Sequence, residues 1–199
     1  MNSYPSGHLH PLEKARALES PLRTLIQDPR RILRNHIRPG MTVLDLGCGT
    51  GYFTLVMAEL LEMKGKVIAA EVQKGMLEIL ERKLRGSEYR RLVQIHNNQE
   101  STLGLTEKVD FVLAFYSLHE MRYLDDILLE MKGILKPEAR VWISEQIFHV
   151  PGSAFKTMIR KLEHIGLEIC ERPKLLISRT VIMRPKGTEG RKDNGGTRT

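Results

Sequence analysis

From Met41 onward, short apolar segments alternate with stretches in which apolar residues recur every three or four positions. The first pattern is typical of buried strands, and the second of helices with one apolar face. Strands are expected at 42–46, 66–71, 92–96, 109–115, 141–147, 167–169 and 177–183. Apolar helix faces are expected at 53–61, 76–84, 124–135 and 155–165. Such alternation predicts an α/β fold, a doubly wound, mostly parallel seven-stranded sheet with helices on both faces.

Three regions are expected along the chain. Ser20-Pro21 and Asp28-Pro29 each place a capping side chain before a proline, as at a helix start. Residues 1–38 are therefore predicted to be an N-terminal helical segment, which is a candidate lid over the site. Residues 39–184 form the main domain, and 185–199, rich in Gly, Thr, Lys and Arg, are predicted to be a disordered basic tail.

Composition and charge limit the kinds of ligand and location that this chain is expected to have. The formal net charge is +7, but the segment from Arg184 to Thr199 holds five basic and two acidic residues and so carries +3 of it. Elsewhere basic and acidic residues interleave along helices, which favours solvated helix faces over a nucleic-acid footprint. No apolar run is long enough to span a membrane. Two cysteines without zinc spacing favour reduced thiols and a cytoplasmic protein, and no metal site is predicted.

The glycine-rich turn after the first strand indicates a ligand site. Glycines at 47, 49 and 51 permit positive φ and let a ligand lie against bare backbone. Glu71 ends the next strand, where a carboxylate can accept hydrogen bonds from both hydroxyls of a ribose. Ligands of such sheets bind outside the carboxyl ends of the strands, where strand order reverses. Together these features predict a nucleoside-binding crevice.

Two other nucleotide sites are excluded by the same turn. The dinucleotide fingerprint requires a third glycine at position 52, where this chain has Tyr52. A phosphate-cradling loop requires Gly-Lys followed by Ser or Thr, and this sequence is absent. The turn therefore favours a nucleoside ligand without a pyrophosphate.

The run Asp45-Leu-Gly-Cys-Gly-Thr-Gly51 resembles the first motif of class I S-adenosylmethionine-dependent methyltransferases. Glu71 falls where that family has its ribose-binding acid. The segments 109–113, 117–120 and 134–137 resemble the family's fourth strand, the turn that follows it and the "LKP" before the fifth strand. The resemblance covers about residues 40 to 184 and is closest to small-molecule methyltransferases of the ubiquinone/menaquinone type. It implies that the last two strands form an antiparallel pair.

The resemblance implies S-adenosylmethionine as the cofactor and a role for each matching residue. Gly47, Gly49 and Gly51 would line the methionine part, and Asp45 would orient their loop. Glu71 would hold the ribose. The remaining cofactor-binding predictions are Val72 against the adenine, Asn98 as acceptor from the adenine amino group and Phe115 beside the methionine part. An acid is usual in the family at the adenine position, so the run 96–99 leaves open which residue accepts there.

Methyl transfer from a sulfonium is an in-line displacement that depends mainly on alignment. A hydroxyl, thiol or protonated amine acceptor would also need a base. The predicted catalytic residues are His119 and Tyr116, which follow the fourth strand; Glu120, Glu145 and His149 are further candidates. His119 could instead only shape its turn.

Three functions stay open on sequence grounds. The first is methyl transfer to a small-molecule acceptor that the sequence does not identify. The second is the same chemistry on RNA or protein, although the stretch 115–118 lacks the prolines that amino-methylating nucleic-acid enzymes have there. The third is a non-catalytic S-adenosylmethionine-binding partner subunit. No oligomeric state follows from the sequence.

Overall fold

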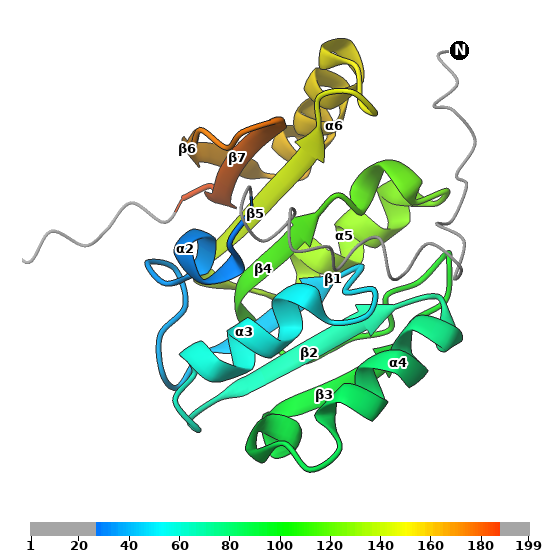
Figure 1. Ribbon diagram of the computed structural model, residues 1–199. Coiled ribbons are helices and arrows are strands. Elements are labelled where there is room, and N and C mark those ends of the chain that lie inside the picture. Colours follow the sequence, from blue (N-terminus) through cyan, green and yellow to red (C-terminus); the bar gives the residue numbers. More distant parts are fainter. Residues whose placement is uncertain (1–26, 188–199) are drawn as a thin grey trace, which may run out of the picture.

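The computed structural model describes residues 27–187, and its centre is a single seven-stranded sheet (Figure 1). The strands lie in the order β3-β2-β1-β4-β5-β7-β6. Their bounds are β1 Thr42–Leu46, β2 Lys66–Glu71, β3 Val93–Asn97, β4 Val109–Phe115, β5 Leu135–Gln146, β6 Leu167–Glu171 and β7 Ser178–Pro185. β7 pairs antiparallel with both β5 and β6, while the other pairs are parallel. The predicted fold class is confirmed, including the antiparallel C-terminal pair.

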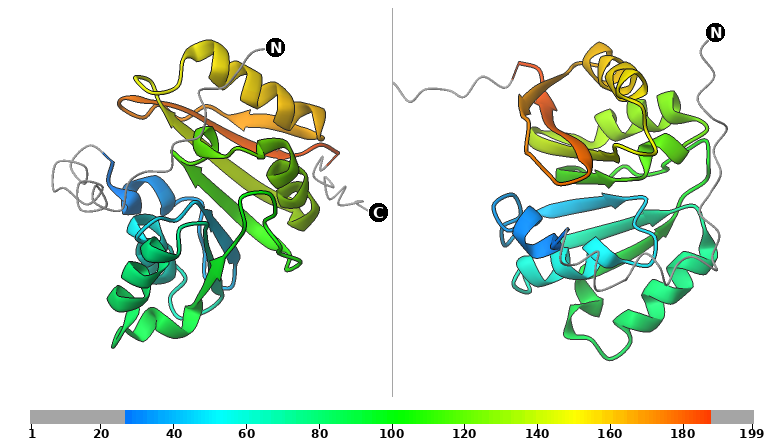
Figure 2. Two further views of the ribbon diagram at one scale, coloured as in Figure 1. Left: turned by 90° about the vertical axis from the view of Figure 1, so that its right-hand side faces the viewer. Right: turned by 45° about the horizontal axis from the view of Figure 1, so that its top comes forward.

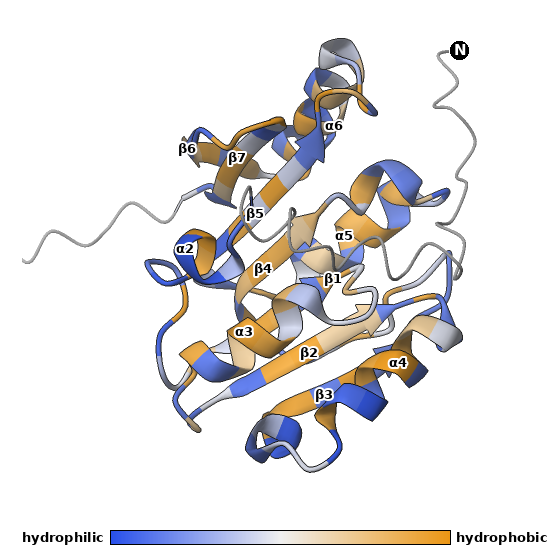
Figure 3. Cartoon of the chain, viewed as in Figure 1, coloured by the Kyte–Doolittle hydropathy of each residue, from blue (hydrophilic) through white to orange (hydrophobic). Residues whose placement is uncertain are grey.

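Helices cover both faces of this sheet (Figures 1 and 2). Their bounds are α2 Pro29–Leu33, α3 Tyr52–Leu60, α4 Lys74–Leu84, α5 Leu124–Ile134 and α6 Gly152–His164. One apolar core joins α5 and α6 to the sheet, and the other joins α2, α3 and α4 to the opposite face. Figure 3 shows apolar residues along β2 and β4 and hydrophilic residues on the outer side of α4. Within residues 27–187, the helices lack the length and apolarity needed to cross a bilayer.

The predicted boundaries hold closely except around β5. β1, β2 and β4 occupy the predicted residues, and Asp28 caps the helix that begins at Pro29 by accepting from the amide of Arg30. β5 begins at Leu135 rather than at 141 because its register with β4 shifts between Val109 and Phe111. The helix expected from Ser20-Pro21 and the tail beyond residue 187 lie outside the described residues.

The strand order places β1 between β2 and β4, so the chain leaves β1 at the point where strand order reverses. Its next residues form the glycine loop, here defined as Gly47–Gly51. Gly47 has φ +77° and its amide donates to the carbonyl of Ala70 at the end of β2, over 2.9 Å. A Cβ on Gly47 would lie 2.4 Å from the Cβ of Ser117, whereas a Cβ on Gly49, with φ +53°, would meet no atom of residues 27–187 within 4 Å. Both positions have a positive φ that favours glycine, but of the two only Gly47 is packed too closely by described residues to carry a side chain.

We predict that Gly47→Ala destabilises the protein more than Gly49→Ala. Positive φ costs an alanine about 1–2 kcal/mol at either position. Overpacking against Ser117 adds about 1–3 kcal/mol at position 47 alone. Urea unfolding followed by circular dichroism measures both free energies of unfolding. Equal losses in the two variants would contradict the close packing of Gly47 on Ser117.

Candidate functional site

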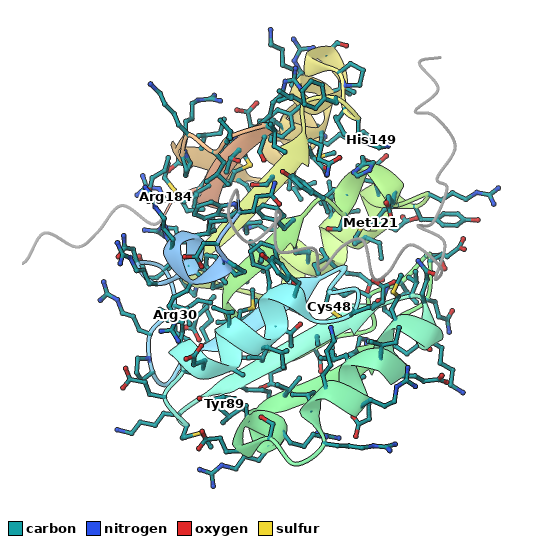
Figure 4. All side chains as sticks on the ribbon, viewed as in Figure 1. Arg30, Cys48, Tyr89, Met121, His149 and Arg184 are labelled. Atoms are coloured by element: carbon teal, nitrogen blue, oxygen red, sulfur yellow. The ribbon has the colours of Figure 1, made fainter. Side chains whose placement is uncertain are left out.

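The candidate site lies along the edge of the sheet where the parallel strands end. Figure 4 places Cys48 of the glycine loop, Met121 after β4 and His149 after β5 along this edge. The edge is built in three parts: the glycine loop with the end of β2, the turn after β4, and the end of β5.

Glu71 is the residue that fixes the first part. Its carboxylate accepts from the amide of Gly49 over 3.1 Å and from the amide of Gln73 over 2.9 Å. The residue is 9% exposed, and this burial raises the pKa of Glu71 above its usual value, while backbone hydrogen bonds from Gln73, Gly49 and Val72 oppose the rise. Each carboxylate oxygen has two lone pairs, so these amides do not use all the acceptor capacity of the side chain.

Asp45 supports the same loop from beneath. It is buried at the end of β1, and its Oδ2 accepts from the Thr54 hydroxyl in α3 over 2.6 Å. This bond ties the strand before the glycine loop to the helix after it. The role of Asp45 in orienting the glycine loop stays a prediction.

The two asparagines at the end of β3, Asn97 and Asn98, make different hydrogen bonds. The Asn97 amide donates to the carbonyls of Glu71 and Val72, over 2.9 and 3.0 Å. The Asn98 amide nitrogen donates to the neighbouring carbonyl of Gln99 over 3.0 Å. This bond does not involve the amide oxygen, so the predicted role of Asn98 as acceptor from the adenine amino group stays a prediction. Asn97 therefore holds the segment that carries Glu71 and Val72. Sequence reasoning missed it because adjacent amides at a strand end differ only in the direction of their side chains.

The predicted catalytic residues lie on opposite faces of the sheet. Tyr116 has φ +61°, packs with the core of α2, α3 and α4, and its hydroxyl contacts Gln27 and Ser178. His119 turns to Glu145 on β5. Glu145 is two residues beyond Ile143 and so shares its face, which packs with α5 and α6. The structure thus separates Tyr116 from His119.

Phe115, the last residue of β4, packs against both α3 and Tyr116. Its ring is buried, with its centroid 4.5 Å from that of Phe53 in α3 and 4.4 Å from that of Tyr116. These ring contacts hold the end of β4 close to α3, the helix that follows the glycine loop.

His119 and Glu145 form a hydrogen-bonded pair of titratable side chains. The His119 Nδ1 lies 2.7 Å from Oε2 of Glu145, and the His119 amide donates to Oε1 over 3.2 Å. Glu145 is fully buried. Burial alone would lower the pKa of His119, but the hydrogen bond and charge of Glu145 raise it above the usual value. The Glu145 partner was only a minor candidate in the sequence, because 26 positions separate it from His119.

Glu120 is the third charged member of this group. Its Oε1 lies 3.8 Å from Nε2 of His119, and its side chain is 19% exposed. Burial raises the pKa of Glu120 to about 7; the His119 charge opposes this, and the charges of Glu71 and Glu145 add to it. Glu120 therefore titrates near neutral pH. Because the charge of Glu71 is one cause of the raised pKa of Glu120, the two carboxyl groups interact electrostatically across the edge.

Residues 37–170 match the model of a family described as "Methyltransferase domain". The chain belongs to this methyltransferase family. The match confirms the predicted methyltransferase family, which implies S-adenosylmethionine as the cofactor. Among the described residues, no group of three or more His, Cys, Asp or Glu side chains is arranged to hold a metal ion.

Individual relatives agree with this assignment. The chain is 31% identical over 110 residues to a demethylmenaquinone methyltransferase of Symbiobacterium thermophilum, covering 55% of this chain and 44% of the relative. It is 30% identical over 146 residues to the ubiquinone/menaquinone biosynthesis C-methyltransferase UbiE of Vibrio vulnificus, covering 73% and 51%. The chain thus spans about half the length of these relatives. The crystal structure of a SAM-dependent methyltransferase from Aquifex aeolicus shares the fold, with a TM-score of 0.77 and 24% identity over 86% of this chain and 96% of that one.

The geometry fits S-adenosylmethionine at this edge. Residues 27–187 leave the space beside Gly49 open, and the buried Glu71 carboxylate, fixed by backbone amides, stands next to it. A sulfonium ligand is cationic, and the neighbouring carboxylates Glu71 and Glu120 suit a positive charge.

We predict that Glu145→Gln lowers the pKa of His119. The variant keeps the shape of the side chain but removes the charge that stabilises the imidazolium, so burial then dominates. Because the raised pKa stabilises the fold only below it, the variant loses most stability at acidic pH and least above the wild-type pKa of His119. A pH titration of the imidazole NMR signals measures the shift. An unchanged His119 pKa would show that Glu145 does not hold the charged form.

Proposed function

We propose that this chain transfers the methyl group of S-adenosylmethionine to a small-molecule acceptor. The observation that carries the proposal is the glycine loop bonded to Glu71, with space beside Gly49 that the described residues do not fill. Glu71 would hold the ribose, and Gly47, Gly49 and Gly51 would face the methionine part with Phe115 beside it. Val72, positioned by Asn97, would lie against the adenine. When bound, the cofactor supplies an electrophilic methyl group, and these residues align it.

The acceptor is proposed from the relatives' names. Both are named for methyl transfer in quinone metabolism, which favours a small aromatic acceptor over RNA or protein. Methylation of a ring carbon leaves one proton to be removed, so a residue that exchanges protons is required. His119, held by Glu145, is the proposed group for this exchange. Tyr116, whose hydroxyl contacts Gln27 and Ser178, is proposed as a positioning residue on the opposite face.

The compartment in which the protein acts is part of the same proposal. Cys48 and Cys170 are free in the structure, as expected for a protein of a reducing compartment. A cytoplasmic location and a non-nucleic-acid acceptor are therefore part of the proposed function. The predicted lid role of residues 1–38 is also kept as a proposal.

We predict that Glu71→Ala weakens binding of both S-adenosylmethionine and S-adenosylhomocysteine at least tenfold. Loss of hydrogen bonds to a charged acceptor costs about 1.5–3 kcal/mol, and 1.4 kcal/mol is about tenfold in affinity. Isothermal titration calorimetry measures this. Glu138→Ala is the matched control, because Glu138 is an exposed glutamate near the start of β5, away from the site. If folded wild-type protein bound neither ligand, the proposed function would be wrong.

Demethylmenaquinone, reduced to the hydroquinone so that its ring is electron-rich, is the first acceptor to assay. We expect formation of S-adenosylhomocysteine together with a methylated product. His119→Ala should slow turnover about 100-fold, the usual contribution of a proton-transfer group, and Tyr116→Phe should slow it less. Because methylation of the ring carbon and methylation of a hydroxyl give the same mass, proton NMR of the purified product distinguishes the two. A Tyr116→Phe variant that loses more activity than His119→Ala would reverse the proposed roles.

A further inference from the structure

Two turns beside the end of β5 expose apolar side chains. β5 is parallel to β4, so its last residue, Gln146, lies at the same edge of the sheet as the candidate site. Among the described residues, the turn that follows β5 exposes Ile147 at 37% and Phe148 at 83%, and the turn before β7 exposes Leu176 at 68%. The Ile147 amide donates to the carbonyl of Ile177 over 3.1 Å, so the two turns lie side by side. We call the three exposed residues, Ile147, Phe148 and Leu176, the apolar patch.

Both turns are fixed by contacts of their neighbours, so the patch is not exposed through loose local packing. Arg179 in β7 donates to the carbonyls of Ile147 and Val150, over 3.2 and 2.7 Å. Val150 is buried in the core formed with α5 and α6. Leu175 packs against the opposite core, while its neighbour Leu176 faces solvent. A single exposed apolar residue is common, but three that are held together on fixed turns indicate a binding surface.

The two segments that carry the patch have a positive charge. Residues 146–151 contain no acidic or basic residue apart from one histidine, and residues 171–179 contain one acidic and three basic residues. The segments together therefore carry a formal charge of +2 with the histidine neutral. Two of the basic residues, Arg172 and Lys174, are exposed, and the third, Arg179, holds the turn after β5.

The neighbouring elements leave this charge unchanged. The rings of His119 and His149 lie 6.0 Å apart, so the turn after β4 adjoins the turn after β5. That turn and α5, residues 116–134, together with α6, residues 152–164, contain five acidic and five basic residues. The surroundings of the apolar patch therefore stay positive and attract anions.

Apolar side chains on fixed turns, beside exposed cations, favour a lipid surface over a protein partner. At the boundary between headgroups and acyl chains, apolar side chains become buried while Lys and Arg stay near anionic headgroups. A stable protein interface instead buries about 800 Å² on each partner. An aromatic residue buries about 150–250 Å², so three apolar side chains fall short of that area.

We propose that the apolar patch docks on the surface of a bilayer that contains anionic lipid. Phe148 and Leu176 would enter the headgroup boundary, and Arg172 and Lys174 would bind lipid phosphates. The chain would bind one leaflet without spanning it, with the edge of the sheet that holds the candidate site turned toward the lipid. This inference goes beyond the proposed function and does not depend on it, since none of these residues is proposed to bind the cofactor or to exchange protons.

Co-sedimentation of the full chain with vesicles tests the proposal without cofactor or acceptor. Vesicles of phosphatidylcholine with about one-third phosphatidylglycerol should bind the protein. Vesicles of phosphatidylcholine alone should bind it more weakly, because each basic residue near an anionic surface contributes about fivefold in affinity. Raising the salt concentration from about 0.1 M to about 0.5 M should weaken binding to the anionic vesicles.

Two variants and two matched controls assign the binding to the patch. Phe148→Ala should weaken binding to the anionic vesicles about tenfold, because burial of the phenyl ring is lost. Lys174→Gln should weaken it about fivefold. Leu129→Ala removes a side chain that is 57% exposed on α5, and Lys64→Gln removes an exposed charge before β2, at the opposite edge of the sheet. Both controls should bind as the wild type does.

Each contrary outcome overturns the docking proposal and leaves cofactor binding untouched. Failure of the wild type to bind anionic vesicles would overturn it directly. Binding that Phe148→Ala leaves unchanged would be the general attraction of a basic protein to an anionic surface. A clearly lower melting temperature of Phe148→Ala would show that the chain itself covers this side chain. Dissociation of a dimer by the same variant, measured by analytical ultracentrifugation, would assign the patch to a second copy of the chain.

Discussion

The bond between the Glu71 carboxylate and the Gly49 amide is the contact on which the candidate site depends. Parallel strands β1 and β2 end at the same edge of the sheet, but their following turns are free to diverge unless something joins them. This bond joins them, and the amides of Gly47 and Cys48, which donate to the Ala70 carbonyl, hold the start of the loop. The loop can then be both glycine-rich and rigid, which a ligand surface made of bare backbone requires.

The second constraint is electrostatic. A fully buried glutamate is costly unless it is paired, and Glu145 meets that requirement through His119, which it binds at both the ring and the amide. The same histidine also lies beside Glu120, where burial raises the pKa of Glu120 to about 7 and the charge of His119 opposes the rise.

Much of this arrangement could be predicted from the sequence, because it depends on local patterns. The apolar runs set β1, β2 and β4, and a glycine turn with an acid one strand later specifies a nucleoside site through backbone geometry alone. The bonds from Asn97 to the carbonyls of Glu71 and Val72 could not be predicted, since Asn97 and Asn98 carry identical amides and only the pleat of the strand decides which one reaches β2. The pairing of His119 with Glu145 depends on the register of β4 with β5, which no local pattern encodes.

The separation of Tyr116 from His119 has the same origin and a chemical consequence. The positive φ of Tyr116 turns the chain at the end of β4, so neighbouring residues of one turn reach opposite faces of the sheet. On the α3 face, the aromatic rings of Phe53, Phe115 and Tyr116 form a rigid, uncharged wall. On the α5 face stand the charged groups. In-line methyl transfer needs alignment of the donor and removal of a proton from the acceptor, and these two tasks make opposite demands on flexibility and polarity. A turn that divides its residues between a rigid aromatic side and a titratable side meets both demands within five residues of the end of one strand.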